Sequence, residues 1–545
     1  MKNKNVVILM TDQQRWDTIR FLGNSTIKTP NLDRLCQSGV GFTHAFTPVP
    51  VCSPARDRLF TGADSSMLGE VNSHLRWRPN IRPLQSVLAE AGYKTGGFGK
   101  MHFKPTRDSH GFTHFALHEE MQSDGREYRE DSDYFTYLRE QGLGHIRYPC
   151  GVRNLLYNQP QISPIPEEHH ETKWVADQAL DFIETFHKDP FLCYASWMQP
   201  HWPVHVPKEW ADMYDINDIE PPVWSKEEED HLPWVSRMQR DCSDMADSEN
   251  EPAMKRMLRS KALYYASISY IDHQVGRILD RLEEYGLMDD TLIVFTTDHG
   301  EMLFDHKSME KRSPYDPSIR IPFIVSGPGM LNPGSPSDDF TTLMDVAPTV
   351  YEFTGVNPPE CSPIAGVSLL GKREEVSARE EVFTEIGSGP NGGFVSVRNR
   401  KWKYNFNHHG GLKQLFDLEN DPNELKNLLL NNPSPDIAKT ADDFHKRLLD
   451  WSREHSIPSR IEDGDFVVVP EPEIPKARNP QYETFVDNLT DQEKSTLWSE
   501  ARSVYEAIKD EAHLDVADLD LECWERMRGE GCIAELEQLM NRKLR

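Results

Sequence analysis

The 545-residue sequence lacks any hydrophobic run long enough to cross a membrane, because no apolar stretch approaches about 18 residues. It also lacks the apolar core of a signal peptide, since polar residues follow directly on the short apolar run at 6–10. We therefore expect a cytoplasmic protein that has no membrane partner. The sequence contains no internal repeat and no low-complexity tract.

Cysteine and positive charge are both scarce. The eight cysteines are scattered and contain no Cys-x-x-Cys pair, so we expect no disulfide framework. Lys and Arg number 60 against 88 Asp and Glu, which gives a net charge of −28. This charge argues against a nucleic-acid partner, although a local basic cluster could still bind an anionic substrate.

The residues that are present favour an α/β fold. Strand-like apolar runs alternate with helical patterns, and the predicted strands lie at 6–10, 93–98, 190–197 and 291–296. Amphipathic patterns predict helices, the longest of them over 262–286. We expect a largely parallel central sheet flanked by helices.

The C-terminal part of the sequence changes in character. Residues 394–398 and 402–406 alternate between apolar and polar residues, which predicts a smaller C-terminal antiparallel α+β subdomain. We place a catalytic domain at 1–375, with an acidic, solvated insertion at about 207–255, and the subdomain at 376–455. A linker and a charged helical tail fill 456–545, and the tail could pack on the core, cover the active site or make a homo-oligomer.

One cysteine, Cys52, stands in a proline-rich stretch that contains Pro50 and Pro54, just before a helical pattern. Arg56 follows four residues later, and a nearby guanidinium would lower the pKa of the thiol and make it a nucleophile. The alternative is a buried structural cysteine beside a surface arginine.

Two predicted strands end in residues that can bind a metal. Asp12 and Gln13 follow the first strand, and Asp298 and His299 follow the strand at 291–296. The ends of parallel strands meet at one edge of a sheet, so Asp12 and Asp298 could converge on one cation. The alternative is that each Asp caps the segment that follows it.

Basic and imidazole side chains occur at other strand ends. Lys100 and His102 are two residues apart after 93–98, so both could face one oxyanion, although an exposed Lys-x-His pair is also common. His201 lies between two prolines after 190–197, and His205 is a weaker candidate nearby.

These motifs together resemble those of the formylglycine-dependent sulfatases, which belong to the alkaline phosphatase superfamily. The resemblance covers about residues 5–430 and rests on Cys-Ser-Pro-Ala-Arg at 52–56, Gly-Lys-Met-His at 99–102, Pro-His-Trp-Pro at 200–203 and the segment that contains Lys311. It implies that a formylglycine-generating or anaerobic sulfatase-maturating enzyme oxidises Cys52 to formylglycine. It also implies that Lys100 and Lys311 bind sulfate, that His102 contacts the nucleophile's partner hydroxyl and that His201 contacts the ester oxygen.

Two residues depart from the usual sulfatase pattern. Gln13 stands where the family has an acid and His299 where it has an amide, and both resemble the phosphonate monoester hydrolase branch of the superfamily. The implied metal ligands are Asp12, Gln13, residue 52, Asp298 and His299. Calcium is usual in the family, and an imidazole ligand makes manganese or another transition metal a further candidate. Asn72 and His74 follow the nucleophile and are candidate substrate-binding residues.

The predicted function is therefore metal-assisted hydrolysis of a small-molecule or saccharide sulfate ester. The alternative from the same superfamily is hydrolysis of phosphonate monoesters or phosphodiesters. A second alternative is a catalytically silent anion-binding protein. Such a protein would be expected to have lost several of the proposed catalytic residues, yet Cys52, Arg56, Lys100, His201 and Lys311 are all present.

Overall fold

A computed structural model describes residues 4–69, 81–119, 132–146, 149–151, 161–242, 251–360, 362–371 and 377–474. Asn72, His74 and the tail from 475 to 545 lie outside the described residues. In the described ranges, no helix is both long enough and apolar enough to span a membrane.

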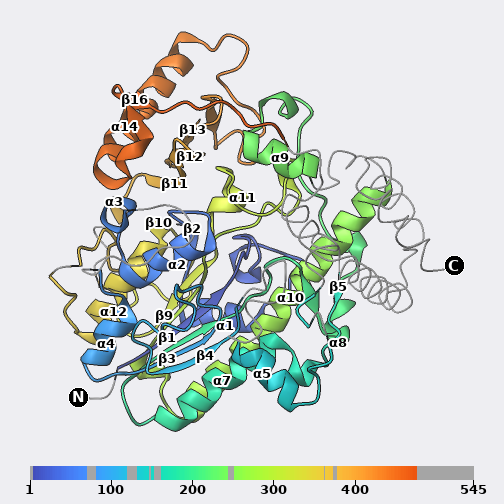
Figure 1. Cartoon of the computed structure of the whole chain (residues 1–545), viewed down its shortest axis with the longest axis vertical. Helices are drawn as coiled ribbons and strands as arrows, with labels where there is room; N and C mark the ends of the chain where they lie inside the picture. The colour runs from blue at the N-terminus through green and yellow to red at the C-terminus, as the bar shows by residue number, and fades with distance from the viewer. Residues whose placement is uncertain are drawn as a thin grey trace.

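A central sheet of eight strands organises the molecule (Figure 1). Its strand order is β10-β2-β9-β8-β1-β6-β3-β4. The strands are β1 (Asn5–Thr11), β2 (Gly39–Phe46), β3 (Lys94–Gly99), β4 (His114–Leu117), β6 (Phe191–Ser196), β8 (Thr291–Thr297), β9 (Phe323–Ser326) and β10 (Ser337–Thr342). Only β9 in this sheet runs antiparallel to its neighbours, so the predicted largely parallel α/β sheet is confirmed.

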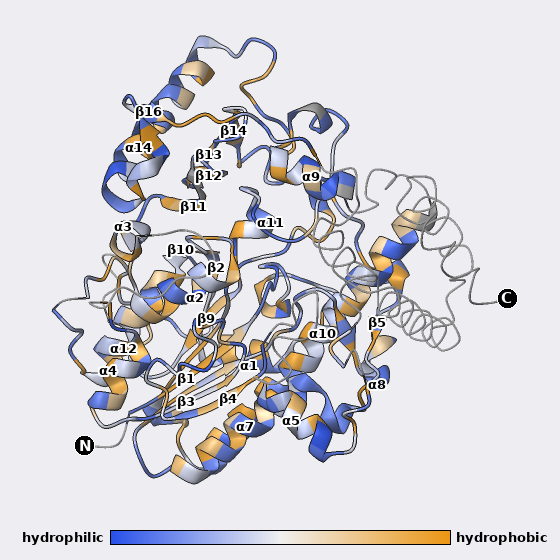
Figure 2. Ribbon diagram, viewed as in Figure 1, coloured by the Kyte–Doolittle hydropathy of each residue, from blue (hydrophilic) through white to orange (hydrophobic). Residues whose placement is uncertain are grey.

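Helices cover both faces of this sheet, and every residue of β1 is buried. Successive side chains of a strand point to opposite faces, so Ile8 packs in one apolar cluster and Leu9 in the other. On the Ile8 face lie α2 (Cys52–Thr61), α4 (Leu84–Glu90) and α12 (Val346–Thr354). On the Leu9 face lie α1 (Pro30–Ser38), α7 (Glu171–Phe186) and α10 (Glu251–Glu284). Figure 2 shows the strands between these layers largely in hydrophobic colours.

The helix predicted over 262–286 begins earlier, at Glu251. Its added turns place Met257 in a third apolar cluster, together with Trp202 and Val206. The insertion is therefore not a solvated loop throughout, since its described part also contains α9 (Trp234–Cys242).

The remaining elements of the main body are short. They are α3 (Ser65–Leu68), α5 (Asp133–Glu140), β5 (Gln161–Ile162), β7 (His205–Val206), α8 (Lys208–Ala211) and α11 (Asp316–Ile319). Single 3-10 turns lie at Arg20–Leu22, Glu167–His169, Ile216–Asp218, Glu229–His231, Met288–Asp290, Asp305–Lys307, Leu343–Asp345 and Pro458–Arg460.

A second, antiparallel sheet lies toward the C-terminus, as predicted. Its four strands follow one another in sequence: β11 (Val382–Gly389), β12 (Gly392–Arg398), β13 (Trp402–Asn407) and β14 (Lys413–Asp417). Helix α14 (Pro435–His455) packs on it through Phe444 and Leu448. The chain stays packed after residue 455, because Phe466 in the hairpin of β15 (Ile461–Glu462) and β16 (Asp465–Phe466) joins the same apolar cluster. The domain boundaries themselves remain predictions.

Candidate active site

The site forms where β1 and β8 end side by side. These parallel strands pair up to Thr11 and Thr297, so the next residues, Asp12 and Asp298, leave the sheet at the same edge. The Gln13 backbone amide donates to Asp298 Oδ1 at 3.0 Å and joins the two strand ends directly. The predicted convergence of the two acids is therefore present in the structure.

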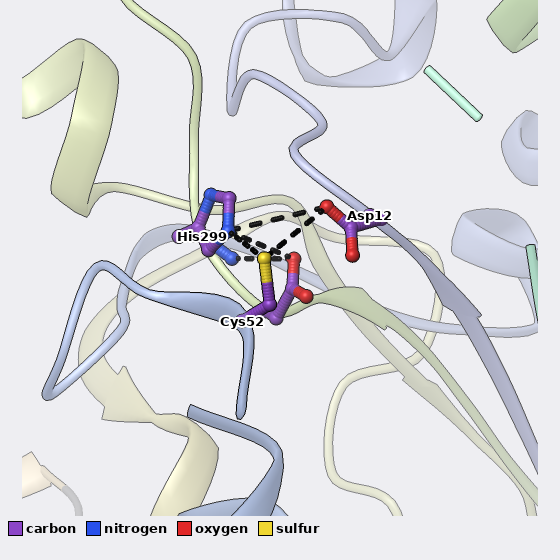
Figure 3. Close-up of side chains that lie close together, drawn as sticks. Asp12, Cys52 and His299 are labelled. Atoms are coloured by element: carbon purple, nitrogen blue, oxygen red, sulfur yellow. Dashed lines mark hydrogen bonds and ion pairs between the residues drawn. The ribbon is translucent and has the colours of Figure 1, made fainter. Parts of the chain in front are cut away.

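Cys52 meets these strand ends from α2, where it is the first helical residue. Its Sγ lies 3.1 Å from His299 Nε2 and 3.8 Å from Asp12 Oδ1, and Figure 3 shows the three side chains pointing toward one another. One ligand atom from each of Asp12, Cys52, Asp298 and His299 lies within 4.8 Å of the others, and all four residues are buried. This donor set fits a divalent cation.

The orientation of His299 suits a metal ligand. Its Nδ1 lies 3.0 Å from the Gly300 carbonyl oxygen, an acceptor, so the ring proton belongs on Nδ1. Nε2 faces Cys52 and the two carboxylates, at 3.7 Å from Asp298 Oδ1 and 4.0 Å from Asp12 Oδ1, and it carries no proton when the ring is neutral. A backbone carbonyl that fixes the tautomer in this way is common behind metal-bound histidines.

Arg56 joins the two acids from behind. Its guanidinium donates to Asp12 Oδ2 and Asp298 Oδ2, both at 3.0 Å, and its side chain is 1% exposed. It also donates to Ser196 Oγ at 2.7 Å and to the Tyr194 hydroxyl at 3.1 Å. Burial opposes its charge, but Tyr194 and the two acids raise the pKa of Arg56 well above its usual range. It is therefore not the surface arginine of the alternative interpretation.

Positive charge surrounds Cys52. Burial alone would raise the pKa of its thiol, but Lys100, Lys311 and His299 outweigh burial and hold the pKa well below its usual range. The His102 side chain lowers the same pKa further. Lys100 Nζ lies 2.6 Å from Asp12 Oδ2, so this lysine also neutralises one of the acids. These positive groups therefore favour an anionic group at position 52.

Lys311 and His201 form a second polar group on the Gln13 side of the site. Lys311 Nζ lies 2.7 Å from both Gln13 Oε1 and His201 Nε2. His201 Nδ1 lies 2.6 Å from the Trp202 carbonyl oxygen, which places the ring proton on Nδ1. The Gln13 amide nitrogen donates to Glu301, so the Gln13 side chain is held between Glu301 and Lys311. Its role as a metal ligand stays a prediction.

Two other basic residues stand close to Lys311 in the sequence and were alternatives to it. Lys307 pairs with Glu229, and Arg312 is exposed, which supports Lys311 as the lysine of this motif. His205 faces Glu171 and not the Cys52 site. Asn72 and His74 are outside the described residues, so their predicted role is untested.

Sequence reasoning missed the residues that hold the site in place. Tyr194 and Ser196 support Arg56 from the buried strand β6, and their type and spacing carry no signal of this role. Glu119 accepts from the backbone amides of Met101 and His102 at 2.9 and 2.8 Å and positions the loop after β3. Glu301 could have been noticed, because it follows His299 by only two residues.

The fold and this site define a hydrolase of the alkaline phosphatase superfamily. The family model described as Sulfatase matches residues 4–356, and one described as N-sulphoglucosamine sulphohydrolase, C-terminal, matches residues 304–454. The chain therefore belongs to the sulfatase family and is a sulfatase-type hydrolase.

Known relatives agree with this assignment. An arylsulfatase of Clostridium perfringens (strain 13 / Type A) is 33% identical over 450 residues, which cover 78% of this chain and 90% of that protein. A choline-sulfatase of Rhizobium meliloti (strain 1021) is 29% identical over 83% of this chain and 87% of that protein. Among solved structures, a phosphonate monoester hydrolase from Silicibacter pomeroyi has a TM-score of 0.70 at 21% identity, covering 86% of this chain and 100% of that one. The similarity to this phosphonate monoester hydrolase shows a shared fold.

Proposed function

We propose that the protein hydrolyses a small-molecule or saccharide sulfate ester with a formylglycine nucleophile derived from Cys52. The observation that carries the proposal is the position of Cys52, buried among two acids and an imidazole and flanked by Lys100 and Lys311. The arylsulfatase and choline-sulfatase relatives support the sulfate ester as the substrate class. A silent anion-binding protein would have no need to retain this complete set.

In this proposal, one hydroxyl of the hydrated aldehyde at position 52 attacks sulfur and displaces the alcohol of the ester. The other hydroxyl then loses its proton and re-forms the aldehyde as the carbon–oxygen bond to sulfate breaks, and water hydrates the aldehyde again. Lys100 and Lys311 neutralise the charge that develops on the transferring group. His102 stands beside the second hydroxyl. Lys311 donates to His201 Nε2, so this pair can deliver a proton to the leaving oxygen.

The donor set at the strand ends fits a resident divalent metal. Asp12, Asp298 and His299 would hold it together with residue 52, and Gln13 Oε1 could contribute if Lys311 released it. Two carboxylates with one imidazole suit calcium or manganese. When bound, such an ion would supply positive charge that favours ionisation of the nucleophilic hydroxyl.

The test is a panel of aryl, choline and sugar sulfates, assayed on protein co-expressed with a maturation enzyme. Turnover of at least one sulfate ester, lost in Cys52→Ala, is expected. A fully converted and folded enzyme that cleaves no sulfate ester would contradict the proposal. Cys36→Ala is a suitable control, because it removes a buried thiol away from the site.

Phosphonate monoesters and phosphodiesters are a second candidate substrate class. Gln13 and His299 stand where the usual sulfatase site has an acid and an amide, so this centre carries less negative charge. A less negative centre should tolerate a more highly charged anion better, and phosphorus esters reach a charge of about −2 in phosphate monoesters against about −1 for sulfate esters. We expect measurable activity on phosphorus esters, and Gln13→Asp/His299→Asn should shift the ratio toward sulfate.

This comparison has one necessary control, which is that the double variant retains its metal. Both activities should be measured between about pH 6 and 9, where histidines and any metal-bound hydroxyl titrate. A wild type without phosphorus-ester activity in this range would contradict the charge argument and leave a dedicated sulfatase.

The cellular setting is also a proposal. We propose that the protein works in the cytoplasm, where an aerobic or anaerobic maturation enzyme would act on the Cys52 motif. Comparing the formylglycine content of protein from the cytoplasm and from a secreted fusion tests this. The tail at 456–545 as a dimerisation segment remains untested too, and truncation followed by light scattering would decide it.

A further inference from the structure

A second group of metal-ligand side chains lies outside the active site. In the described part of the chain, ligand atoms of His, Cys, Asp and Glu converge in groups of three or more at two places, the site around Cys52 and a group formed by His118, Cys150 and Glu171. All three residues of this second group are buried, and their ligand atoms lie within 4.8 Å of one another. We propose that they bind a zinc ion.

The distances suit a tetrahedral ion. Zinc bonds of about 2.0–2.1 Å to nitrogen and about 2.3 Å to thiolate sulfur place neighbouring ligand atoms about 3.4–3.6 Å apart. Cys150 Sγ lies 3.7 Å from His118 Nε2, close to that separation. His118 Nε2 and Glu171 Oε2 are 2.7 Å apart, a hydrogen bond that must open when the ion enters.

Ligand type points to zinc in particular. A thiolate and an imidazole select zinc or another borderline-soft ion over calcium and magnesium, which prefer oxygen. On binding, the Cys150 thiol and the His118 ring nitrogen would each bind without a proton, and any protons displaced would leave to solvent. Three protein ligands leave one position of the tetrahedron for a water molecule.

Neighbouring histidines support the carboxylate ligand from outside. His170 Nδ1 accepts from the Thr172 backbone amide at 3.2 Å, so its proton is on Nε2, which lies 3.3 Å from His205 Nδ1. His205 then carries its proton on Nε2, which points at Glu171 Oε1 from 3.5 Å. His205 Nε2 and Glu171 Oε1 are both buried, and neither atom takes part in a hydrogen bond. A small movement of Glu171 toward the ion would let His205 orient it.

The site would join segments that carry catalytic loops. His118 follows β4, and its backbone amide donates to the Gly99 carbonyl at 3.0 Å, directly before Lys100. Glu171 begins α7, whose Thr172 carbonyl accepts from the Trp197 indole at 2.8 Å, ahead of the His201 loop. A metal here would hold the loops that present Lys100 and His201 without touching substrate.

Metal content measured on the full-length protein tests the proposal. We expect about one zinc per chain after incubation with Zn²⁺ and dialysis. Cys150→Ser and His118→Asn should each lose that equivalent, whereas Asp298→Asn and the control Cys36→Ala should keep it. Zinc that is absent from wild type, or that is lost only in Asp298→Asn, would overturn the assignment in favour of a metal-free polar cluster.

A second measurement is independent of whether those variants fold. Cobalt bound to a thiolate gives a near-ultraviolet charge-transfer band, and Cys52→Ala removes the Cys52 thiol from the active site. Cobalt-substituted Cys52→Ala protein should keep the band. A spectrum without it would also overturn the proposal. Neither readout depends on turnover, so failure here is distinct from failure of the sulfatase mechanism.

Discussion

Asp12 and Asp298 lie side by side in a buried site, and positive groups surround them. Arg56 bridges them, and Lys100 contacts Asp12 at 2.6 Å. Burial raises the pKa of Asp12, but Lys100, His201 and Arg56 outweigh burial and lower it. The same residues thus prepare a charged, oxygen-rich position for a cation before any substrate arrives.

This leads to a prediction for Asp298→Asn. The amide can still accept from the Gln13 backbone but brings no charge, so metal affinity should fall by at least about tenfold and activity should fall with it. Metal content by elemental analysis and titration calorimetry are the measurements. Unchanged metal in both Asp298→Asn and Asp12→Asn would refute the site, and Asp33→Asn serves as the control.

At the scale of residues, the sequence predicted which side chains form the metal site better than it predicted the hydrogen bonds that hold them. Asp12, Cys52, Asp298 and His299 were predicted from strand ends and motifs, and they do lie together. The contacts of Arg56 with Tyr194 and Ser196 could not be predicted, because nothing in a buried strand marks which side chain meets a distant helix. Gln13 shows the same limit, since its bonds to Lys311 and Glu301 depend on loop geometry.

At the scale of elements, the 3-10 turn at Asp305–Lys307 fastens the insertion to the body. His306 Nδ1 lies 2.6 Å from Glu228 Oε2, its ring stacks on Tyr315, and its backbone amide donates to the Val223 carbonyl. Burial lowers the pKa of His306, but Glu228, with Glu424 and Asp305 nearby, outweighs burial and raises it above 6.5.

The pH dependence follows from that direction. A histidine whose pKa is raised by folding contributes stability that is complete below its unfolded value and is lost as pH rises through the folded value. Hydrogen exchange of amides near 223–231, corrected for intrinsic rates, should therefore accelerate with rising pH, by up to about tenfold per unit of pKa shift. His306→Gln should remove this dependence, and exposed His273→Gln should not. A dependence that persists in His306→Gln would contradict the assignment.

Element types were predicted well and element ends less well. Helix α10 starts at Glu251, about three turns before the predicted residue 262, and Met254, Met257 and Leu258 extend its apolar side over these turns. Cys52 begins α2 although Pro54 lies nearby, since proline is tolerated in the first turn of a helix.

At the scale of the molecule, a buried ion cluster joins the two sheets. Asp316 of α11 accepts from Arg398 of β12 and, at 2.9 Å, from Lys403 of β13, and its backbone amide donates to Glu424. Burial opposes its ionisation, but Arg398 and Lys403 lower the pKa of Asp316 below its usual range. Its contribution to stability is therefore present at neutral pH and is lost only in strong acid.

Removing this carboxylate should loosen the C-terminal sheet. Asp316→Ala leaves two buried cations without their shared partner, which should lower the free energy of unfolding by about 3–5 kcal/mol. Urea denaturation measures the change. The control is Asp338→Ala, which breaks an exposed pair with Arg400 and should cost about 0–1 kcal/mol. Equal effects of the two substitutions would contradict a structural role for the cluster.

The fold class was predictable from the sequence, but the order and direction of the strands in the central sheet were not. Alternating strands and helices indicated a mostly parallel sheet, and short-range alternation indicated the antiparallel one. The strand order could not be derived, because β1 pairs with β8 across more than half of the main body of the chain and no local pattern encodes that contact. The reversed direction of β9 was equally hidden.

The central claim is that formylglycine at position 52 is the nucleophile, and one measurement tests it most directly. Preparations with different degrees of Cys52 conversion can be made by varying co-expression of the maturation enzyme. The converted fraction is then read from the mass of the peptide that contains residue 52, and sulfate ester turnover per chain is plotted against it. We expect a straight line through the origin, with Cys52→Ala at zero. Full activity in protein whose residue 52 is entirely thiol would contradict the account.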